Sequence, residues 1–382
     1  MPKVYNWQLN REVEYPYDAA KPKRQFAMIM NINKCIGCQT CTMACKTTWS
    51  VGRGQEYMLW NNVETKPHGF YPLGWDVHLM EEFDKAGVKQ EWENGVYKGK
   101  TIIEAAPPGE RTLGWLPEDL DWANPNIGED ETAEPVDIGT IIEKFPSPIW
   151  MFYLPRICNH CSYPACLAAC PRKAIYKRQE DGIVLIDPER CEGYQECVRA
   201  CPYKKSMFNQ VVGISQKCIG CFPKVEQGLM TQCVTTCIGH VRIMGFVNEP
   251  DHIVEDNPID FLVHVKKVAL PLYPQTGMQP NVYYIPPITV PLKYLRQMFG
   301  PGADRAVETY KRMREGKEPE LQALLLLFGA TEYIPHKFKV EDGFVSAFDE
   351  NGKELVRVPL TEPIIERPAY DPKLGVTRQD IS

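Results

Sequence analysis

The sequence lacks several features that would assign it to a common class of protein. It has no run approaching the roughly 20 apolar residues of a bilayer-spanning helix, and its N-terminus has no apolar stretch typical of a signal peptide. Its net charge is −6 with both signs interspersed, which disfavours nucleic-acid binding. It contains no GxGxxG or Walker sequence, so no nucleotide site is indicated. We therefore expect membrane contact and any export to come only through partner proteins.

Cysteine, by contrast, is abundant. The 382 residues include 15 cysteines, whereas disulfide frameworks are typical of small secreted chains with an even count. The four runs that contain every cysteine are Cys35-x2-Cys38-x2-Cys41-x3-Cys45, Cys158-x2-Cys161-x4-Cys166-x3-Cys170, Cys191-x5-Cys197-x3-Cys201 and Cys218-x2-Cys221-x11-Cys233-x3-Cys237. Metal ligation is therefore the favoured interpretation of the cysteines, within a chain whose 44% hydrophobic content predicts a packed core.

The spacing within the runs is that of bacterial ferredoxins. Three thiolates in a tight loop can bind three corners of one cubane cluster, while the fourth ligates the other cluster of a pair and is commonly followed by proline. Proline follows Cys170 and Cys201, whereas Lys46 and Ile238 follow the last cysteines of runs one and four. Zinc sites with four thiolates use paired CxxC knuckles instead. A zinc-stapled scaffold protein is therefore the less favoured alternative.

The sequence between the runs indicates how they pair. Residues 174–177 and 183–186 are predicted as two short strands of a hairpin between runs two and three, which is the layout of a two-cluster ferredoxin. Runs one and four then pair with each other, flanked by predicted strands at 26–30 and 241–246. Pairing run one with two and three with four stays open, although it would divide the hairpin unit. We expect an α+β fold with a nested, tandem pair of bacterial-ferredoxin-like units that forms a four-cluster core.

Exchange of the fourth ligand within each pair gives four ligand sets. Sites 1 to 4, in this order, are Cys35, Cys38, Cys41 and Cys237; Cys45, Cys218, Cys221 and Cys233; Cys158, Cys161, Cys166 and Cys201; and Cys170, Cys191 and Cys197. At site 4, Tyr194 stands where the middle cysteine is expected. We therefore expect three [4Fe–4S] clusters and one [3Fe–4S] cluster. Tyr194 either packs over the vacant corner, which is the simpler interpretation, or ligates iron through its phenol.

The remaining sequence suggests five segments. These are an N-terminal arm (1–24), an outer two-cluster unit (25–45 and 205–250), an insertion (46–150), an inner two-cluster unit (151–204) and a C-terminal extension (251–382). The insertion is rich in tryptophan and has an acidic stretch at 129–137, and we expect it to contact other subunits. The extension has predicted helices and β-hairpins, and we expect it to clamp partner subunits.

No catalytic group of residues is evident. His160 and His240 lie beside cluster cysteines, and each is better explained as a hydrogen-bond donor to sulfur or a surface residue than as a base. The chain is thus expected to be a non-catalytic part of a redox enzyme.

The cysteine runs resemble those of a known family. CIGCQTCTMACKTTW, CNHCSYPACLAACPRKAIYKRQEDGIVLID, CEGYQECVRACPYKK and KCIGCFPKVEQG are similar to the β subunits of the type II dimethyl-sulfoxide-reductase family. That family includes nitrate, perchlorate and selenate reductases and ethylbenzene dehydrogenase. Within it, the β subunit of nitrite oxidoreductase is the most similar, next to that of nitrate reductase, and the segments that carry this resemblance are MPKVYNWQLNREVEYPY, GQEYMLWNNVETKPHGFYPL and GYQECVRACPYKK. The resemblance covers about residues 20–300.

This resemblance implies partners as well as a function. It implies a catalytic α subunit carrying molybdenum bis-pterin and a haem b γ subunit, with electrons relayed between the molybdenum subunit and a haem or quinone-side acceptor. The implied reaction is nitrite oxidation to nitrate or its reverse. A selenate, perchlorate or hydrocarbon-hydroxylating enzyme is the alternative, because the α subunit binds the substrate. The resemblance also implies export of the folded chain with the α subunit to the non-cytoplasmic side of the membrane, with the cytoplasmic face as the alternative.

Overall fold

A central four-stranded sheet joins parts of the chain that are distant in sequence. The computed structural model describes residues 1–17, 22, 24–123, 150–361, 369–371, 373 and 375–378. In this sheet β3 (Gln25–Asn31) pairs antiparallel with β12 (Arg242–Val247) and parallel with β14 (Val282–Ile285), and β13 (Leu270–Pro271) forms the far edge. The side chains of β3 from Phe26 to Met30 are fully buried, as expected for a continuous apolar strand covered on both faces.

Short helices that carry cysteines pack in pairs. Helix α1 (Thr40–Trp49) packs against α8 (Gln232–Thr235), which joins runs one and four. Helix α5 (Ala165–Ala169) packs against α6 (Glu196–Ala200), which joins runs two and three. This packing favours the nested pairing of the runs over the sequential one.

Hairpins accompany these helices. The strands β8 (Ile175–Lys177) and β9 (Val184–Ile186) pair antiparallel, which confirms the predicted hairpin between runs two and three. A second hairpin of β10 (Ser206–Asn209) and β11 (Ile214–Lys217) leads directly into Cys218, with the short helix α7 (Phe222–Val225) after Cys221.

The insertion is built into the interior of the protein. Its strand β4 (Asn62–Lys66) pairs antiparallel with β7 (Phe152–Arg156). Its other elements are α2 (Trp75–Lys85), β5 (Trp92–Glu93), β6 (Val96–Tyr97) and α3 (Asp119–Ala123). Three of its seven tryptophans are buried and four are half-buried. Three of them therefore pack inside this chain, and contact of the insertion with other subunits stays a prediction. The acidic stretch at 129–137 lies outside the described residues.

The ends of the chain add smaller elements. Near the N-terminus, β1 (Lys3–Asn6) and β2 (Arg11–Glu14) form a hairpin. The extension begins with α9 (Pro258–Asp260) and a π-helical turn, Phe261–Val265, and later has a 3-10 turn, Pro274–Thr276. Its segment up to Ile285 supplies β13 and β14 to the central sheet. The expected boundary at residue 251 therefore does not separate the extension from the core.

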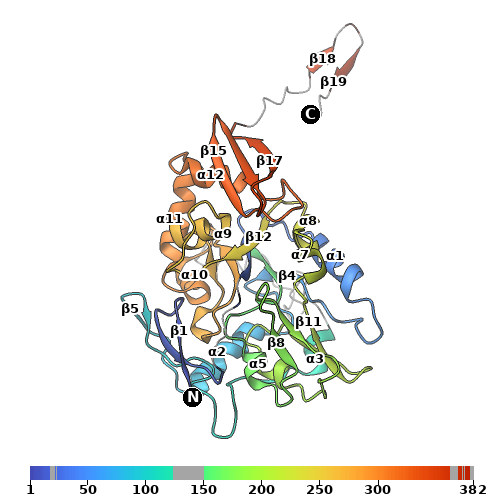
Figure 1. Ribbon diagram of the computed structural model, residues 1–382, viewed down its shortest axis with the longest axis vertical. Helices are drawn as coiled ribbons and strands as arrows, with labels where there is room; N and C mark the ends of the chain where they lie inside the picture. Colours follow the sequence, from blue (N-terminus) through green and yellow to red (C-terminus); the bar gives the residue numbers. More distant parts are fainter. Residues whose placement is uncertain are drawn as a thin grey trace, which may run out of the picture.

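Beyond Ile285, the extension forms helices and then a sheet. The helices are α10 (Leu292–Phe299), α11 (Ala303–Arg314) and α12 (Pro319–Leu326), and a three-stranded sheet follows with β15 (Lys337–Glu341), β16 (Phe344–Phe348) and β17 (Glu354–Pro359). The last pair is β18 (Ala369–Asp371) with β19 (Val376–Arg378). In Figure 1 the helices lie along the opposite side of the molecule from α1 and α8. None of the helices in the described ranges has the length and apolarity to cross a bilayer.

Candidate cluster sites

One backbone conformation recurs in the loops of all four runs. The second residue after the first cysteine has a positive φ in each run, at Gly37 (68°), His160 (40°), Gly193 (70°) and Gly220 (62°). This left-handed region is readily adopted by glycine and only rarely by other residues. The residue that follows is a cysteine in runs one, two and four and Tyr194 in run three. The loop shape thus gives Tyr194 the same backbone position as a second cysteine.

The cysteines expected at sites 1, 2 and 3 gather around three separate cavities. The first cavity is lined by Cys35, Cys38, Cys41 and Cys237, the second by Cys45, Cys218, Cys221 and Cys233, and the third by Cys158, Cys161, Cys166 and Cys201. Their empty volumes, including space open to solvent, are similar at about 320, 340 and 350 Å³. In each cavity one cysteine comes from a different run than the other three. Within the described part of the chain, no three Cys, His, Asp or Glu side chains converge on a position for a single metal ion.

The three cysteines of site 4 also lie near one another. Cys170 and Cys191 are close enough to Cys197 for their charges to interact. The Ser206 hydroxyl lies 3.3 Å from Cys197 Sγ, to which it donates a hydrogen bond. Tyr194 is 62% exposed, so this residue lies at the surface beside site 4.

Electrostatic interactions connect the four sites pairwise, in the order 1, 2, 3 and 4. Arg242 lines the cavity of site 1, and its positive charge also acts on the Cys45 thiol at site 2, whose pKa it lowers. Cys218 of site 2 interacts electrostatically with Cys158 of site 3. Cys166 of site 3 interacts in the same way with Cys197 of site 4. Each site therefore has a close neighbour, which is the arrangement that stepwise electron transfer requires.

Several N–H groups point at the cysteine sulfurs. The indole Nε1 of Trp49 donates to Cys221 Sγ (3.2 Å), and so does the backbone N–H of Gln232 (3.4 Å). The backbone N–H groups of Ala174 and Ser215 donate to Cys170 Sγ (3.3 Å) and Cys191 Sγ (3.4 Å), respectively. Hydrogen bonds of this kind stabilise negative charge on sulfur and influence the reduction potential of a bound cluster.

Four cations are buried around the cysteines without a carboxylate partner. Among the described side chains Lys204, Lys205, Lys217 and Arg242 are at most 4% exposed, and none of them forms an ion pair with an Asp or Glu. Burial opposes the charge of Lys217, but the Cys158, Cys166 and Cys218 thiols outweigh it and raise the pKa of the ammonium. Burial instead lowers the pKa of Lys204 and Lys205 to about 7. Uncompensated buried charge is strongly destabilising, so the charged forms of these four groups require anions nearby. Thiolate-ligated clusters are anionic, so cysteines surrounded by buried cations fit such clusters.

The two histidines beside the cysteines differ in their surroundings. His160 is fully buried, and its Nδ1 accepts a hydrogen bond from the Val184 N–H (3.0 Å). Burial, together with the charges of Lys217 and Lys177, lowers the pKa of His160 well below its usual value, so the ring is neutral. His160 is therefore not a surface residue, whereas His240 is exposed. Within the described part of the chain the Nε2 of His160 is buried without a partner, and His160 lines the cavity of site 3, so donation to sulfur stays a prediction.

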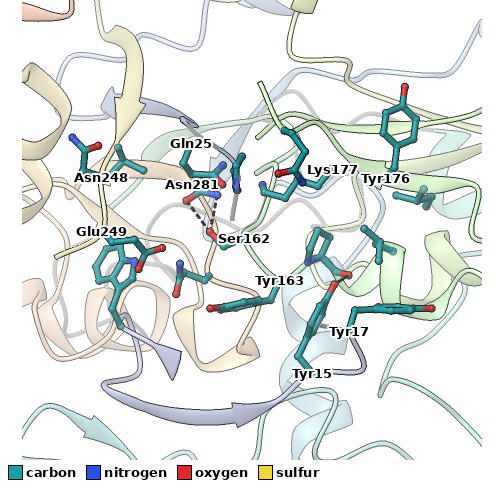
Figure 2. A pocket seen from close by; sticks show the side chains of 18 of the residues that line it. Tyr15, Tyr17, Gln25, Ser162, Tyr163, Tyr176, Lys177, Asn248, Glu249 and Asn281 are labelled. Atoms are coloured by element: carbon teal, nitrogen blue, oxygen red, sulfur yellow. Dashed lines mark hydrogen bonds between the residues drawn. The ribbon is translucent and has the colours of Figure 1, made fainter. Parts of the chain in front are cut away.

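A large cleft with both polar and apolar lining residues lies beside site 3 and is shown in Figure 2. Its polar groups mainly hold the loop between Cys161 and Cys166. Tyr15 donates its hydroxyl to Pro164 O (3.1 Å), and Asn281 Nδ2 donates to Ser162 Oγ (3.2 Å). Lys177 donates to the backbone oxygens of His160 and Cys161. These contacts fix the ligand loop and form no catalytic set.

The sequence analysis missed these supporting residues. Lys217 directly precedes Cys218, and Lys204 and Lys205 follow Cys201 by three and four residues, so proximity to cysteine was a usable signal for these three. Arg242 and Asn281 carried no such signal, because they reach the sites only through the pairing of β12 and β14 with β3. Long-range contacts of this kind leave no local pattern in the sequence.

Comparison with known proteins agrees with this geometry. Residues 149–247 match a family model described as a 4Fe-4S dicluster domain, which covers runs two, three and four. The chain is 42% identical over 327 residues to the dimethylsulfide dehydrogenase subunit beta of Rhodovulum sulfidophilum, covering 80% of this chain and 95% of that protein.

Two further relatives have similar identity. The selenate reductase subunit beta of Thauera selenatis is 42% identical over 334 residues, with 80% of this chain and 96% of that protein covered. The respiratory nitrate reductase subunit beta of Haloferax mediterranei is 40% identical over 332 residues, with 76% and 86% covered. The chain therefore belongs to the iron–sulfur β subunits of the molybdenum oxidoreductases, which transfer electrons for a catalytic α subunit.

Proposed function

We propose that the chain binds three [4Fe–4S] clusters at sites 1 to 3 and one [3Fe–4S] cluster at site 4, within two nested ferredoxin-like units. The observation that carries this proposal is the gathering of each four-cysteine set around one cavity of similar size. Such clusters supply one-electron transfer. The protein contributes the thiolates, the N–H donors to sulfur, and the buried cations that balance their charge.

Exposed residues around sites 1 and 4 suggest which partner subunit binds near each of these two sites. Ile36, Met43 and Ile238 are exposed around site 1, and Tyr194, Val211 and Val212 are exposed around site 4. Exposed apolar side chains gathered at one place are typical of interfaces. We propose that the site 1 surface binds the α subunit and that the site 4 surface faces a haem b γ subunit or another quinone-side acceptor.

The proposed reaction is nitrite oxidation to nitrate, or the reverse. The N-terminal segments that resemble nitrite oxidoreductase support it. Relatives named for dimethylsulfide, selenate and nitrate are equally similar to this chain at 40–42% identity, so a selenate, perchlorate or hydrocarbon enzyme is the alternative. We also propose export with the α subunit to the non-cytoplasmic side of the membrane. Identification of the α subunit that copurifies with the chain tests the reaction, and protease accessibility in intact cells tests the location.

Metal analysis tests the cluster content directly. Three clusters of four irons and one of three predict about 15 iron atoms per fully loaded chain and no stoichiometric zinc. Quantitative iron, sulfide and zinc determination on the purified complex, after the α subunit's own iron is subtracted, measures this. Stoichiometric zinc, or iron sufficient for only two clusters in this chain, would contradict the proposal.

Replacement of Tyr194 by cysteine tests the assignment of site 4. We expect Tyr194→Cys to supply a fourth thiolate and convert the [3Fe–4S] cluster to a [4Fe–4S] cluster of lower potential. The oxidised variant should then lose the near-isotropic electron paramagnetic resonance (EPR) signal of a [3Fe–4S] cluster. Tyr194→Phe is the matched control, because it keeps the ring and removes only the phenol oxygen. If Tyr194→Phe changes the cluster, the phenol is a ligand and the assignment to three thiolates is wrong.

A further inference from the structure

A single arginine borders both sites of the outer unit. Arg242 is the first residue of β12 and is 1% exposed. Its Nη2 donates a hydrogen bond to Cys41 Sγ of site 1 (2.9 Å), and its Nη1 donates to Asn61 Oδ1 (3.1 Å). Arg242 lines the cavity of site 1, and Asn61 lines the cavity of site 2. The guanidinium group therefore lies at the junction of the two sites.

The position of Arg242 is fixed by the central sheet. Its backbone pairs with Met30 of β3, a strand that is buried from Phe26 onward and ends four residues before Cys35. The strand β12 in turn begins five residues after Cys237. The same pair of strands thus positions the arginine and the first and last cysteines of site 1.

Sulfur atoms dominate the electrostatic surroundings of Arg242 among the described residues. In the described part of the chain, the groups whose charges act on this guanidinium most strongly are the thiols of Cys41, Cys233, Cys237 and Cys35, which belong to both sites. A guanidinium keeps its charge in proteins at all ordinary pH values. Its contribution to the sites is therefore permanent and independent of protonation.

We propose that Arg242 raises the reduction potential of the cluster at site 1 and, more weakly, of the cluster at site 2, an inference that rests on the proposed ligand sets. One electron arriving from a neighbouring redox centre makes an anionic cluster more negative. A fixed positive charge in the low-dielectric interior stabilises that reduced state. No bond or proton changes at Arg242, which acts through the cluster and not on substrate.

The test is a redox titration of the purified complex followed by EPR, with three variants. Arg242→Met removes the charge and the hydrogen bond, Arg242→Gln removes the charge but keeps an N–H donor, and Arg242→Lys keeps the charge. We expect the first two to decrease the equilibrium constant for reduction of site 1 at least tenfold, which equals 59 mV for one electron. Arg242→Lys should retain most of the wild-type potential, and site 4 should not change in any variant.

Iron content and EPR first confirm that site 1 is loaded in each variant. An unchanged site 1 potential in loaded Arg242→Gln would refute the inference, as would an equal shift at all four sites, because that indicates a general disturbance of the fold. If Arg242→Met fails to retain the cluster, the site 1 potentials of Arg242→Gln and Arg242→Lys are compared instead, because these two variants also differ in the positive charge. Absence of an iron–sulfur signal from site 1 in the wild type would instead contradict the ligand assignment itself, and this inference with it.

Discussion

Replacement of Cys45 by serine is expected to destroy the cluster at site 2 and leave the cluster at site 1 in place. Cys45 belongs to run one, but it lines the cavity formed by Cys218, Cys221 and Cys233. A serine hydroxyl is a far poorer iron ligand than a thiolate, so site 2 would lose one of four ligands. Because site 2 lies between sites 1 and 3, electron transfer through the complex should fall by more than about 10–100-fold, the usual cost of losing even an outer-shell partner of a metal ligand.

Cys41→Ser provides the matched control. It is the same substitution one helical turn earlier in α1, and Cys41 lines the cavity of site 1. EPR or Mössbauer spectroscopy of the two variants should therefore show opposite losses, site 2 for Cys45→Ser and site 1 for Cys41→Ser. If both variants lose the same cluster, the four cysteines of run one ligate together and the exchange of ligands between runs is wrong.

Local sequence patterns predicted a large part of the fold. The apolar run at 26–30 became β3, and Gly300-Pro301, a pair of residues that commonly ends a helix, separates α10 from α11, where Gly300 has a φ of 77°. Both signals are local. The first is a continuous run of apolar residues, and the second is a glycine, which tolerates the left-handed region. The cysteine spacing likewise led to sets that the fold gathers around common cavities, because loop shape and helix periodicity fix the direction of each thiol.

What the sequence did not reveal depends on long-range pairing. The segment 282–285 reads as part of a proline-rich stretch, yet β14 lies beside β3 in the central sheet and is fully buried. A parallel partner some 250 residues away in sequence leaves no periodic signal. The tryptophans of the insertion illustrate a related point. Composition does not distinguish an aromatic residue in an interface from one in a core, and Trp75 proved to be fully buried.

Trp75 is part of a buried ion cluster that joins the insertion to site 3. Glu64 is fully buried and accepts hydrogen bonds from Arg156 and from Trp75 Nε1 (3.0 Å). Lys66 lies 3.3 Å from Glu64 and 2.8 Å from Asp76. Burial alone would raise the pKa of Glu64, but the charges of Arg156 and Lys66 outweigh it and hold that pKa below its usual value.

The same cluster reaches a ligand loop. Arg156 stacks 3.6 Å from the centre of the Trp75 ring and donates to the backbone oxygen of Tyr203. Tyr203 follows Cys201-Pro202, and Cys201 belongs to site 3. The carboxylate of Glu64 thus compensates the arginine that holds this loop against the insertion.

Glu64→Gln is expected to be among the most destabilising single substitutions in the chain. It nearly preserves side-chain shape but leaves Arg156 buried without its carboxylate, which typically costs about 3–5 kcal/mol. For a chain of this length that corresponds to a decrease of about 5 °C in melting temperature. Differential scanning calorimetry of the complex, together with the loss of iron–sulfur absorption on heating, measures the effect.

Glu315→Gln is the control for Glu64→Gln, because Glu315 pairs with Lys317 at the surface, where both side chains are more than half exposed. Solvent screening leaves an exposed pair with little effect on stability, so this variant should melt within about 1 °C of the wild type. Adding Arg156→Gln to Glu64→Gln should recover part of the lost stability, since the cost comes from the uncompensated guanidinium. If Glu64→Gln melts at the same temperature as Glu315→Gln, the buried carboxylate does not stabilise the chain, and the insertion is held to site 3 by apolar packing alone.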